Sequence, residues 1–215
     1  YKRQNPYIVK QSLITGVPSF NTLPGIVSDL DFDQNGNLYC GGSDQGLYIV
    51  DSELSSIIAS DYTDVSIKAI RVFESHVYVA GNYSGEEDDV PSIGVWRNQI
   101  LSPEGVLGEK EIVLDWGEFA GVNSNITGIT FDEDGTMYIS SDANVAIGLY
   151  SSEGIFSELF PKIISAPIAK MTWGSKNYMY LNYRGNPRAV YRLDMGLNGS
   201  TYHCLLYTSP SPRDS

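Results

Sequence analysis

Residues 128–139 read Gly-Ile-Thr-Phe-Asp-Glu-Asp-Gly-Thr-Met-Tyr-Ile, and this stretch indicates the fold class of the chain. Two apolar runs flank an Asp-Glu-Asp-Gly turn, with Asp first and Gly last, as a type I turn followed by a left-handed glycine requires. Residues 30–39 repeat the pattern as Leu-Asp-Phe-Asp-Gln-Asn-Gly-Asn-Leu-Tyr, and weaker copies occupy residues 70–78 and 171–180. The sequence therefore predicts one β-hairpin type that occurs four times.

The repeats have a period near 40 residues. Their register tyrosines lie 39, 60 and 42 residues apart, and the long interval contains two expected loop insertions, 84–91 and 98–110. Further short strands follow each hairpin, and no helical stretch of ten residues is evident. Such a period with four short strands is typical of a propeller blade. The second strands are continuously apolar, for example at residues 137–139, which fits sheets covered on both faces.

We therefore expect an all-β fold, a β-propeller with about four of six or more blades present, with a β-sandwich as the alternative. The expected domain is a partial propeller over residues 1–203, with repeats near 26–60, 65–115, 126–160 and 166–195. An open propeller leaves blade faces and sheet edges uncovered, so we expect poor solubility of residues 1–203.

The last twelve residues, 204–215, resemble the translation of a transposase-type sequencing adapter, beginning Cys-Leu-Leu-Tyr-Thr-Ser-Pro. We expect them to be non-native and the protein to continue beyond His203. Without Cys204, Cys40 stands in an apolar run, where a small buried hydrophobic residue is the favoured interpretation.

Composition excludes several classes of function. The formal charge of −12 argues against binding to nucleic acid, which needs a basic surface, and no apolar run is long enough to span a membrane. The two histidines, His76 and His203, cannot build a His-rich zinc site or a convincing Ser/His/Asp triad. We place His76 at a strand edge and assign no catalytic residues.

The repeated phrase at residues 128–139 resembles the repeat of NHL-type and gluconolactonase-type (senescence-marker-like) six-bladed propellers. In the lactonase branch the resemblance implies a divalent metal in the central channel, held by carboxylates and by an Asn before a Gly-Ile pair. Here Thr127 precedes Gly128-Ile129, and Asp29 interrupts the equivalent place in the first repeat. The resemblance thus implies the fold, while the metal ligands depart from the pattern.

Two acidic segments could be read as cation sites. Residues 31–36 begin like an EF-hand loop, but Gly42 stands where a bidentate Glu is required, so we expect a hairpin turn. The run Glu86-Glu87-Asp88-Asp89 is expected to be a solvated loop. No metal site is assigned, and a divalent cation such as calcium stays open as a cofactor.

The candidate binding residues are Tyr183, Arg184, Asn186 and Arg188. An aromatic face, two guanidinium groups and an amide between two strands suit recognition of a sugar, a carboxylate or a peptide, with a plain loop as the alternative. We expect a non-enzymatic binding or scaffolding propeller, extracellular, periplasmic or on the cell surface, that holds a glycan or protein through loops on one face. The alternative is a metal-dependent lactonase-like hydrolase that uses carboxylates such as Asp29, Asp31 and Asp142.

Overall fold

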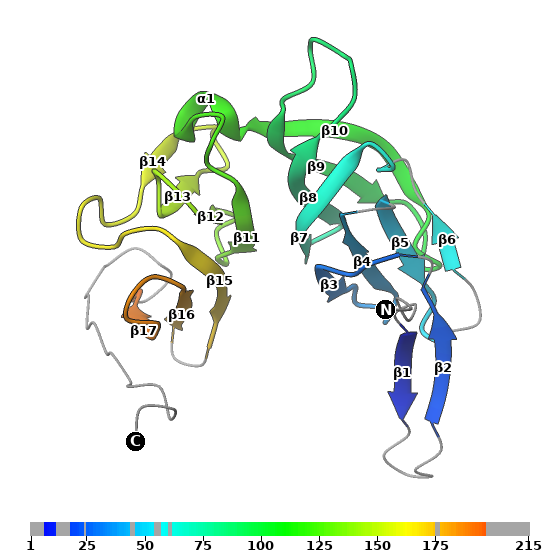
Figure 1. The fold of residues 1–215 in the computed structure, drawn as a ribbon. Helices are drawn as coiled ribbons and strands as arrows, with labels where there is room; N and C mark the ends of the chain where they lie inside the picture. Colours follow the sequence, from blue (N-terminus) through cyan, green and yellow to red (C-terminus); the bar gives the residue numbers. More distant parts are fainter. Residues whose placement is uncertain are drawn as a thin grey trace, which may run out of the picture. The chain divides into compact units, whose positions relative to one another are not determined.

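The structure is a computed structural model that describes residues 7–11, 18–23, 25–43, 46–53, 57–59, 62–174 and 177–196. The chain divides into two compact units, Tyr1–Asp115 and Trp116–Ser215, which are described separately (Figure 1). The expected foreign segment 204–215 lies outside the described residues.

The first unit contains a hairpin and two four-stranded antiparallel sheets. The hairpin is β1 (Tyr7–Gln11) with β2 (Pro18–Thr22), and the first sheet is ordered β3 (Asp29–Phe32), β4 (Leu38–Gly42), β5 (Gly46–Val50) and β6 (Ile57–Ala59). The second is β7 (Val65–Phe73), β8 (His76–Tyr83), β9 (Ile93–Ile100) and β10 (Leu107–Asp115). Each sheet is thus an up-and-down meander of consecutive strands.

One expectation for the first unit is wrong. Residues 98–110 do not form a loop insertion, because β9 continues to Ile100 and β10 begins at Leu107, with Leu107 opposite Ile100. Two of the charged residues that indicated a loop, Glu109 and Lys110, lie on the exposed part of β10, where charged side chains stay in contact with solvent. Only residues 101–106 connect the two strands.

The second unit begins with the short helix α1 (Trp116–Ala120) and contains two further antiparallel sheets. Their strands are β11 (Ile126–Phe131), β12 (Met137–Ser141), β13 (Ile147–Tyr150) and β14 (Phe156–Glu158), then β15 (Ile168–Trp173), β16 (Tyr178–Tyr183) and β17 (Ala189–Asp194). In the described part of the chain, no helix is both long enough and apolar enough to cross a bilayer.

Within each unit, the first strands of the two sheets lie side by side and are joined by side chains. Asp29 and Asp31 on β3 accept the backbone N–H groups of Ile70 and Val72 on β7, at 3.0 and 2.8 Å. In the second unit, Thr127 Oγ1 on β11 donates to the carbonyl of Ile168 on β15 at 2.5 Å. All three bonds join residues 41 positions apart, which matches the sequence period.

Apolar side chains from facing sheets fill the space between them. In the first unit, Tyr39, Ile49, Ile67 and Trp96 belong to one buried cluster, and in the second unit Tyr138 packs with Met171, Leu181 and Leu193. Trp173 meets the Tyr138 ring edge-to-face at 5.5 Å between centroids, and so packs between two sheets. The second strands β4 and β12 are buried over all five of their residues, as strands covered on both faces are, whereas in β16 only Met179 and Leu181 are buried.

Candidate functional site

The four predicted binding residues lie around one hairpin loop, residues 184–188, between β16 and β17. Arg184, Asn186 and Arg188 are exposed, whereas Tyr183 at the end of β16 is half-buried. The loop is anchored at its other end by the buried Ala189. The structure therefore presents three of the four side chains to solvent on one short loop.

Tyr183 does not present the exposed aromatic face that the sequence predicted, but is half-buried. Its ring lies against Gly185, because a Cβ atom at that glycine would collide with the Tyr183 phenol. Its ring centroid is also 5.5 Å from that of Tyr191. Tyr183 therefore supports the loop backbone, and the side chains available to a ligand are those of Arg184, Asn186 and Arg188.

Loop 184–188 is joined to the linker between β14 and β15, residues 159–167. The backbone N–H of Arg184 donates to the carbonyl of Pro167 at 3.0 Å. Leu159 and Ile164 are buried and hold the linker to the core, while Lys162 between them is exposed. The two segments together form one end of the unit, because the linker and the β16–β17 loop both adjoin the start of β15.

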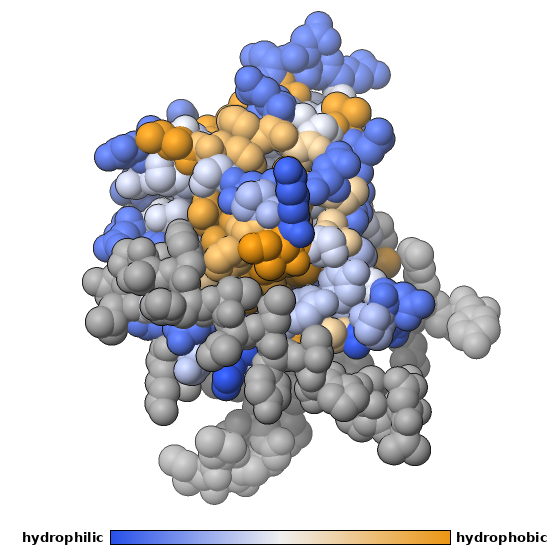
Figure 2. Space-filling view, turned by 90° about the vertical axis from the view of Figure 1, so that its left-hand side faces the viewer, coloured by the Kyte–Doolittle hydropathy of each residue, from blue (hydrophilic) through white to orange (hydrophobic). Residues whose placement is uncertain are grey.

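A pocket of about 500 Å³ opens at this end of the second unit. It is lined by residues of the β12–β13 loop, of β14 and of the linker, namely Asp142, Ala143, Asn144, Glu158, Pro161, Lys162, Ile164, Ser165 and Ala166. Ala166 in the pocket wall directly precedes Pro167, whose carbonyl accepts the N–H of Arg184, so the pocket adjoins loop 184–188. Figure 2 shows strongly hydrophilic side chains beside a hydrophobic patch on the face turned to the viewer.

Buried hydroxyl groups fix the pocket wall formed by residues 142–145. Ser124 and Ser141 are fully buried, with their Oγ atoms 3.0 Å apart. Ser124 Oγ donates to the carbonyl of Ala143 and Ser141 Oγ to that of Val145, each at 2.5 Å. Because unmade bonds would be costly at such buried groups, this network holds the loop in one conformation.

The backbone around the pocket is unusual for its residue types. Asn144, Phe160 and Lys162 have φ angles of 54°, 51° and 67°, in the left-handed region that side chains rarely adopt. Asn144 tolerates it and donates its Nδ2 to the carbonyl of Ala120 at 2.7 Å. Such conformations persist only where surrounding contacts enforce them, and they are common at binding sites.

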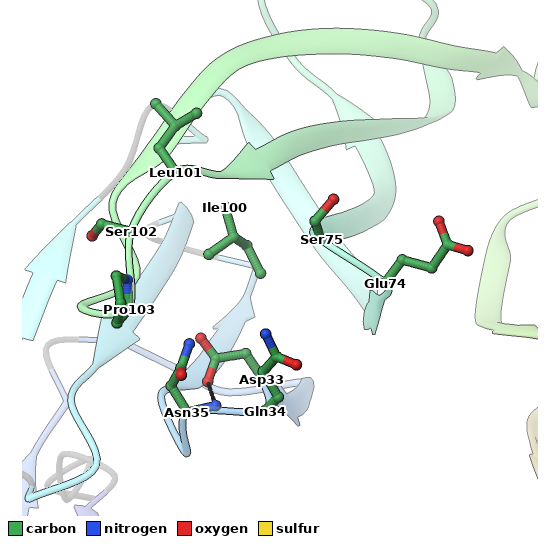
Figure 3. Close-up of a pocket in the computed structure, with 9 residues that line it drawn as sticks. All are labelled: Asp33, Gln34, Asn35, Glu74, Ser75, Ile100, Leu101, Ser102 and Pro103. Atoms are coloured by element: carbon green, nitrogen blue, oxygen red, sulfur yellow. Dashed lines mark hydrogen bonds between the residues drawn. The ribbon is translucent and has the colours of Figure 1, made fainter.

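A second pocket, of about 250 Å³, lies in the first unit (Figure 3). In Figure 3 the turn of Asp33, Gln34 and Asn35 faces Ile100 and the loop containing Ser102 and Pro103, while Glu74 points away from that turn. The Asp33 carboxylate stabilises its own turn, because it accepts hydrogen bonds from the N–H groups of Asn35 and Asn37, both at 2.9 Å. This turn therefore has the structural role that the sequence predicted for it.

The residues present do not fit the metal site that the lactonase resemblance implies. Asp29 and Asp31 accept backbone N–H groups of β7, and Asp142 accepts the N–H and Nδ2 of Asn125 at 2.8 and 2.9 Å. Thr127, at the position of the expected Asn, bonds to Ile168. Within the described residues, no three His, Cys, Asp or Glu side chains form a group that could hold a metal ion.

The remaining titratable candidates have structural surroundings. Cys40 is fully buried, and burial raises the pKa of its thiol to about 12, so the reactive thiolate is disfavoured. His76 begins β8 beside Tyr78, and partial burial together with Arg97 lowers the pKa of its imidazole. The acidic residues 86–89 are all exposed, as expected of a solvated loop.

Sequence reasoning missed the linker 159–167 and a short repeat that shapes two loops. Residues 82–85 read Asn-Tyr-Ser-Gly and residues 182–185 read Asn-Tyr-Arg-Gly. In both, a Cβ atom on the glycine would collide with the tyrosine phenol, so Tyr83 covers Gly85 as Tyr183 covers Gly185. The repeated Asn-Tyr-x-Gly spacing could have predicted the shared loop structure from the sequence. The linker 159–167 has no such pattern, because the pocket that it lines is formed with segments that are distant in the sequence.

Consecutive antiparallel sheets, three with four strands and the last with three strands among the described residues, pack face to face within each unit at a period near 40 residues. This arrangement defines the fold class as a β-propeller. Solved structures agree. The β-propeller domain of Cps50 (Swd1) from Myceliophteria thermophila matches with a TM-score of 0.65 over 98% of this chain and 67% of that domain, at 9% sequence identity.

Two bacterial proteins are also similar. An auxiliary nutrient binding protein from Bacteroides thetaiotaomicron matches with a TM-score of 0.59 and 17% identity, over 83% of this chain and 40% of its own. PorZ, a surface component of the type-IX secretion system of Porphyromonas gingivalis, matches with a TM-score of 0.56 and 14% identity, over 85% and 27%. The chain thus spans less than half of either protein. At these identities the likeness shows the fold alone, and no protein-family model or curated protein sequence matches this chain.

Proposed function

We propose that this chain is part of a non-enzymatic binding propeller that holds a glycan or a protein through the loops at one end of its second unit. The observation that carries the proposal is the pocket bounded by the linker 159–167, next to the exposed side chains of loop 184–188. Concave sites with a few convergent polar groups are where proteins commonly bind ligands. The nutrient-binding protein among the structural neighbours supports a binding role.

We further propose that the protein is exported, to the periplasm, the cell surface or the medium. The likeness to a surface component and to a nutrient-binding protein, both from bacteria, supports this location. The assignment to an NHL-type or gluconolactonase-type repeat is likewise a proposal. The same hydrogen-bonded turn, which occurs twice, supports this assignment. Asp33 accepts a hydrogen bond from the Tyr39 hydroxyl at 3.2 Å, and Asp132 accepts one from the Tyr138 hydroxyl at 3.1 Å.

The test is a binding panel of glycans and bacterial envelope proteins with the 215-residue chain immobilised. We expect at least one ligand class to bind and to be lost when Arg184, Asn186 and Arg188 are all replaced by Ala. The matched control replaces the exposed Glu133 and Glu153, in turns at the opposite ends of the strands, and should bind as the parent chain does. Absence of any binding in the panel would overturn the proposed function.

A further inference from the structure

Three cations of the second unit differ from the other cations in the described part of the chain, because they form no ion pair or ring contact there. Arg71 pairs with Asp31, Arg97 with Glu111 and Lys110 with Asp64, and Arg192 lies over the Tyr178 ring. Lys68 and Lys170 also interact with other groups. In contrast, Lys162, Arg184 and Arg188 are exposed, and their side chains form no ion pair or ring contact with the described residues.

These three cations share one end of the unit. Lys162 lies in the linker 159–167, and the bond from Arg184 N–H to Pro167 joins that linker to loop 184–188. The turns at the opposite ends of the strands carry acidic residues instead, including Asp132, Glu133, Asp134 and Glu153. Asp142 and Glu158 also lie at the loop end, so it is the three exposed cations there, and not a full separation of charge, that favour an anionic ligand in a chain of net charge −12.

The pocket beside the cations has the lining that a sugar needs. Ser165 supplies a hydroxyl group, and Asn144 retains its amide oxygen as an acceptor because its Nδ2 donates to Ala120. Glu158, half-buried in the wall, accepts hydrogen bonds but donates none when ionised. Asp142 is also in the wall, with its carboxylate bonded to Asn125. Sugar hydroxyls would donate to Glu158, whereas a carboxylate, whether of a sugar or of a peptide, would be repelled by it and would lie outside the pocket.

We infer that the ligand is a sugar chain bearing carboxylate groups, such as a uronic acid polymer; the inference rests on the proposed binding function. Its hydroxyl groups enter the pocket beside Glu158 and Ser165. Its carboxylates pair with the guanidinium groups of Arg184 and Arg188, which suit bidentate contacts, and with Lys162.

The experiment is calorimetric titration of the 215-residue chain with oligogalacturonate, with a neutral galactan of equal length, and with polyglutamate. We expect oligogalacturonate to bind at least about tenfold more tightly than either of the others, and its affinity to fall as salt rises, because exposed charge pairs are screened. Replacing both arginines, Arg184→Gln with Arg188→Gln, should weaken binding about tenfold or more, since both bidentate contacts to the carboxylates are lost.

Arg97→Gln is the control, because it makes the same type of substitution once, at an exposed ion pair in the first unit, and should leave affinity unchanged. A second variant, Arg184→Lys with Arg188→Lys, keeps the charge and should bind with intermediate affinity. Equal binding of neutral and acidic sugars, or unaltered binding by the Gln variant, would overturn the inference and leave the proposed function in place. Preferential binding of polyglutamate would also overturn the inference and leave the proposed function in place. If no glycan and no protein in the wider panel bound, the proposed function itself would be overturned.

Discussion

At the scale of single residues, an aspartate at the first hairpin turn of a sheet has one structural role in two places. The Asp33 carboxylate accepts four hydrogen bonds, two from backbone N–H groups and one each from Asn37 Nδ2 and the Tyr39 hydroxyl. Asp132 accepts three, from the N–H groups of Asp134 and Thr136 and from Tyr138. Asp33 is 8% exposed, and its partner Asn37 also donates to the carbonyl of Pro103.

This difference in burial predicts unequal stability losses. We expect Asp33→Ala to lower the free energy of unfolding by about 3 kcal/mol, because it leaves several buried donors without an acceptor. Asp132→Ala, at a half-buried turn, should cost about 1 kcal/mol because water can replace the lost acceptor. Urea unfolding of both variants measures the two losses, and equal values would contradict the assigned role of burial.

The sequence predicted these turns because the Asp-to-Gly spacing is local and chemically specific. It could not predict where Asp29 and Asp31 point, since their partners lie 41 residues ahead on another sheet. For the same reason their carboxylates were counted as candidate metal ligands, whereas the structure gives them backbone partners. At the candidate site, the exposure of Arg184 and Arg188 followed from a polar loop between strands, but the contribution of Lys162 depended on the folded linker.

At the scale of elements, neighbouring first strands are held together by side chain to backbone bonds. We expect Asp29→Ala and Asp31→Ala each to lower the free energy of unfolding by about 1–2 kcal/mol, because the N–H groups of Ile70 and Val72 lose their acceptors. Asp31→Asn keeps an acceptor oxygen and should recover most of the loss, since the Arg71 pair at 3.9 Å is weak.

Glu109→Ala, on the exposed part of β10 in the same unit, serves as the control for removal of a carboxylate and should have little effect. Chemical denaturation of all four proteins tests the prediction. If Asp31→Asn were as unstable as Asp31→Ala, the charge rather than the acceptor would be the stabilising feature.

The Asn-Tyr-x-Gly segment supports two loops that carry opposite charges. Tyr83 and Tyr183 each cover a glycine two residues later, so the same Asn-Tyr-x-Gly design begins both loops. The first loop continues with Glu86–Asp89 and the second contains Arg184 and Arg188. The backbone support is therefore shared, and the side chains that follow it determine which ligands each loop attracts.

At the scale of the whole molecule, one sheet face presents apolar side chains to solvent. Leu30 and Phe32 are 45% and 56% exposed, and they alternate with Asp29 and Asp31, which bond to β7. In a propeller, a face of this kind is covered by another blade. The exposed pair is the apolar surface from which we expect association of the isolated chain.

We expect Leu30→Thr with Phe32→Thr to increase the soluble, monomeric fraction of the chain, because threonine keeps the strand preference and removes apolar surface. The unfolding midpoint should change little, since neither side chain is buried. Size-exclusion chromatography with light scattering measures the effect, and Ile112→Thr, at another exposed position, is the control. An unchanged monomer fraction would show that this face does not drive association.

Amide hydrogen exchange of the 215-residue chain, with and without saturating oligogalacturonate, tests most directly whether ligand is held at the loop end of the second unit. Binding there predicts slower exchange in residues 159–167, 142–145 and 184–188, with no change in the turns at 132–136 and 151–155. Protection of those turns, or of the 101–106 loop in the first unit, with unchanged exchange in the linker would contradict the assignment of the binding site.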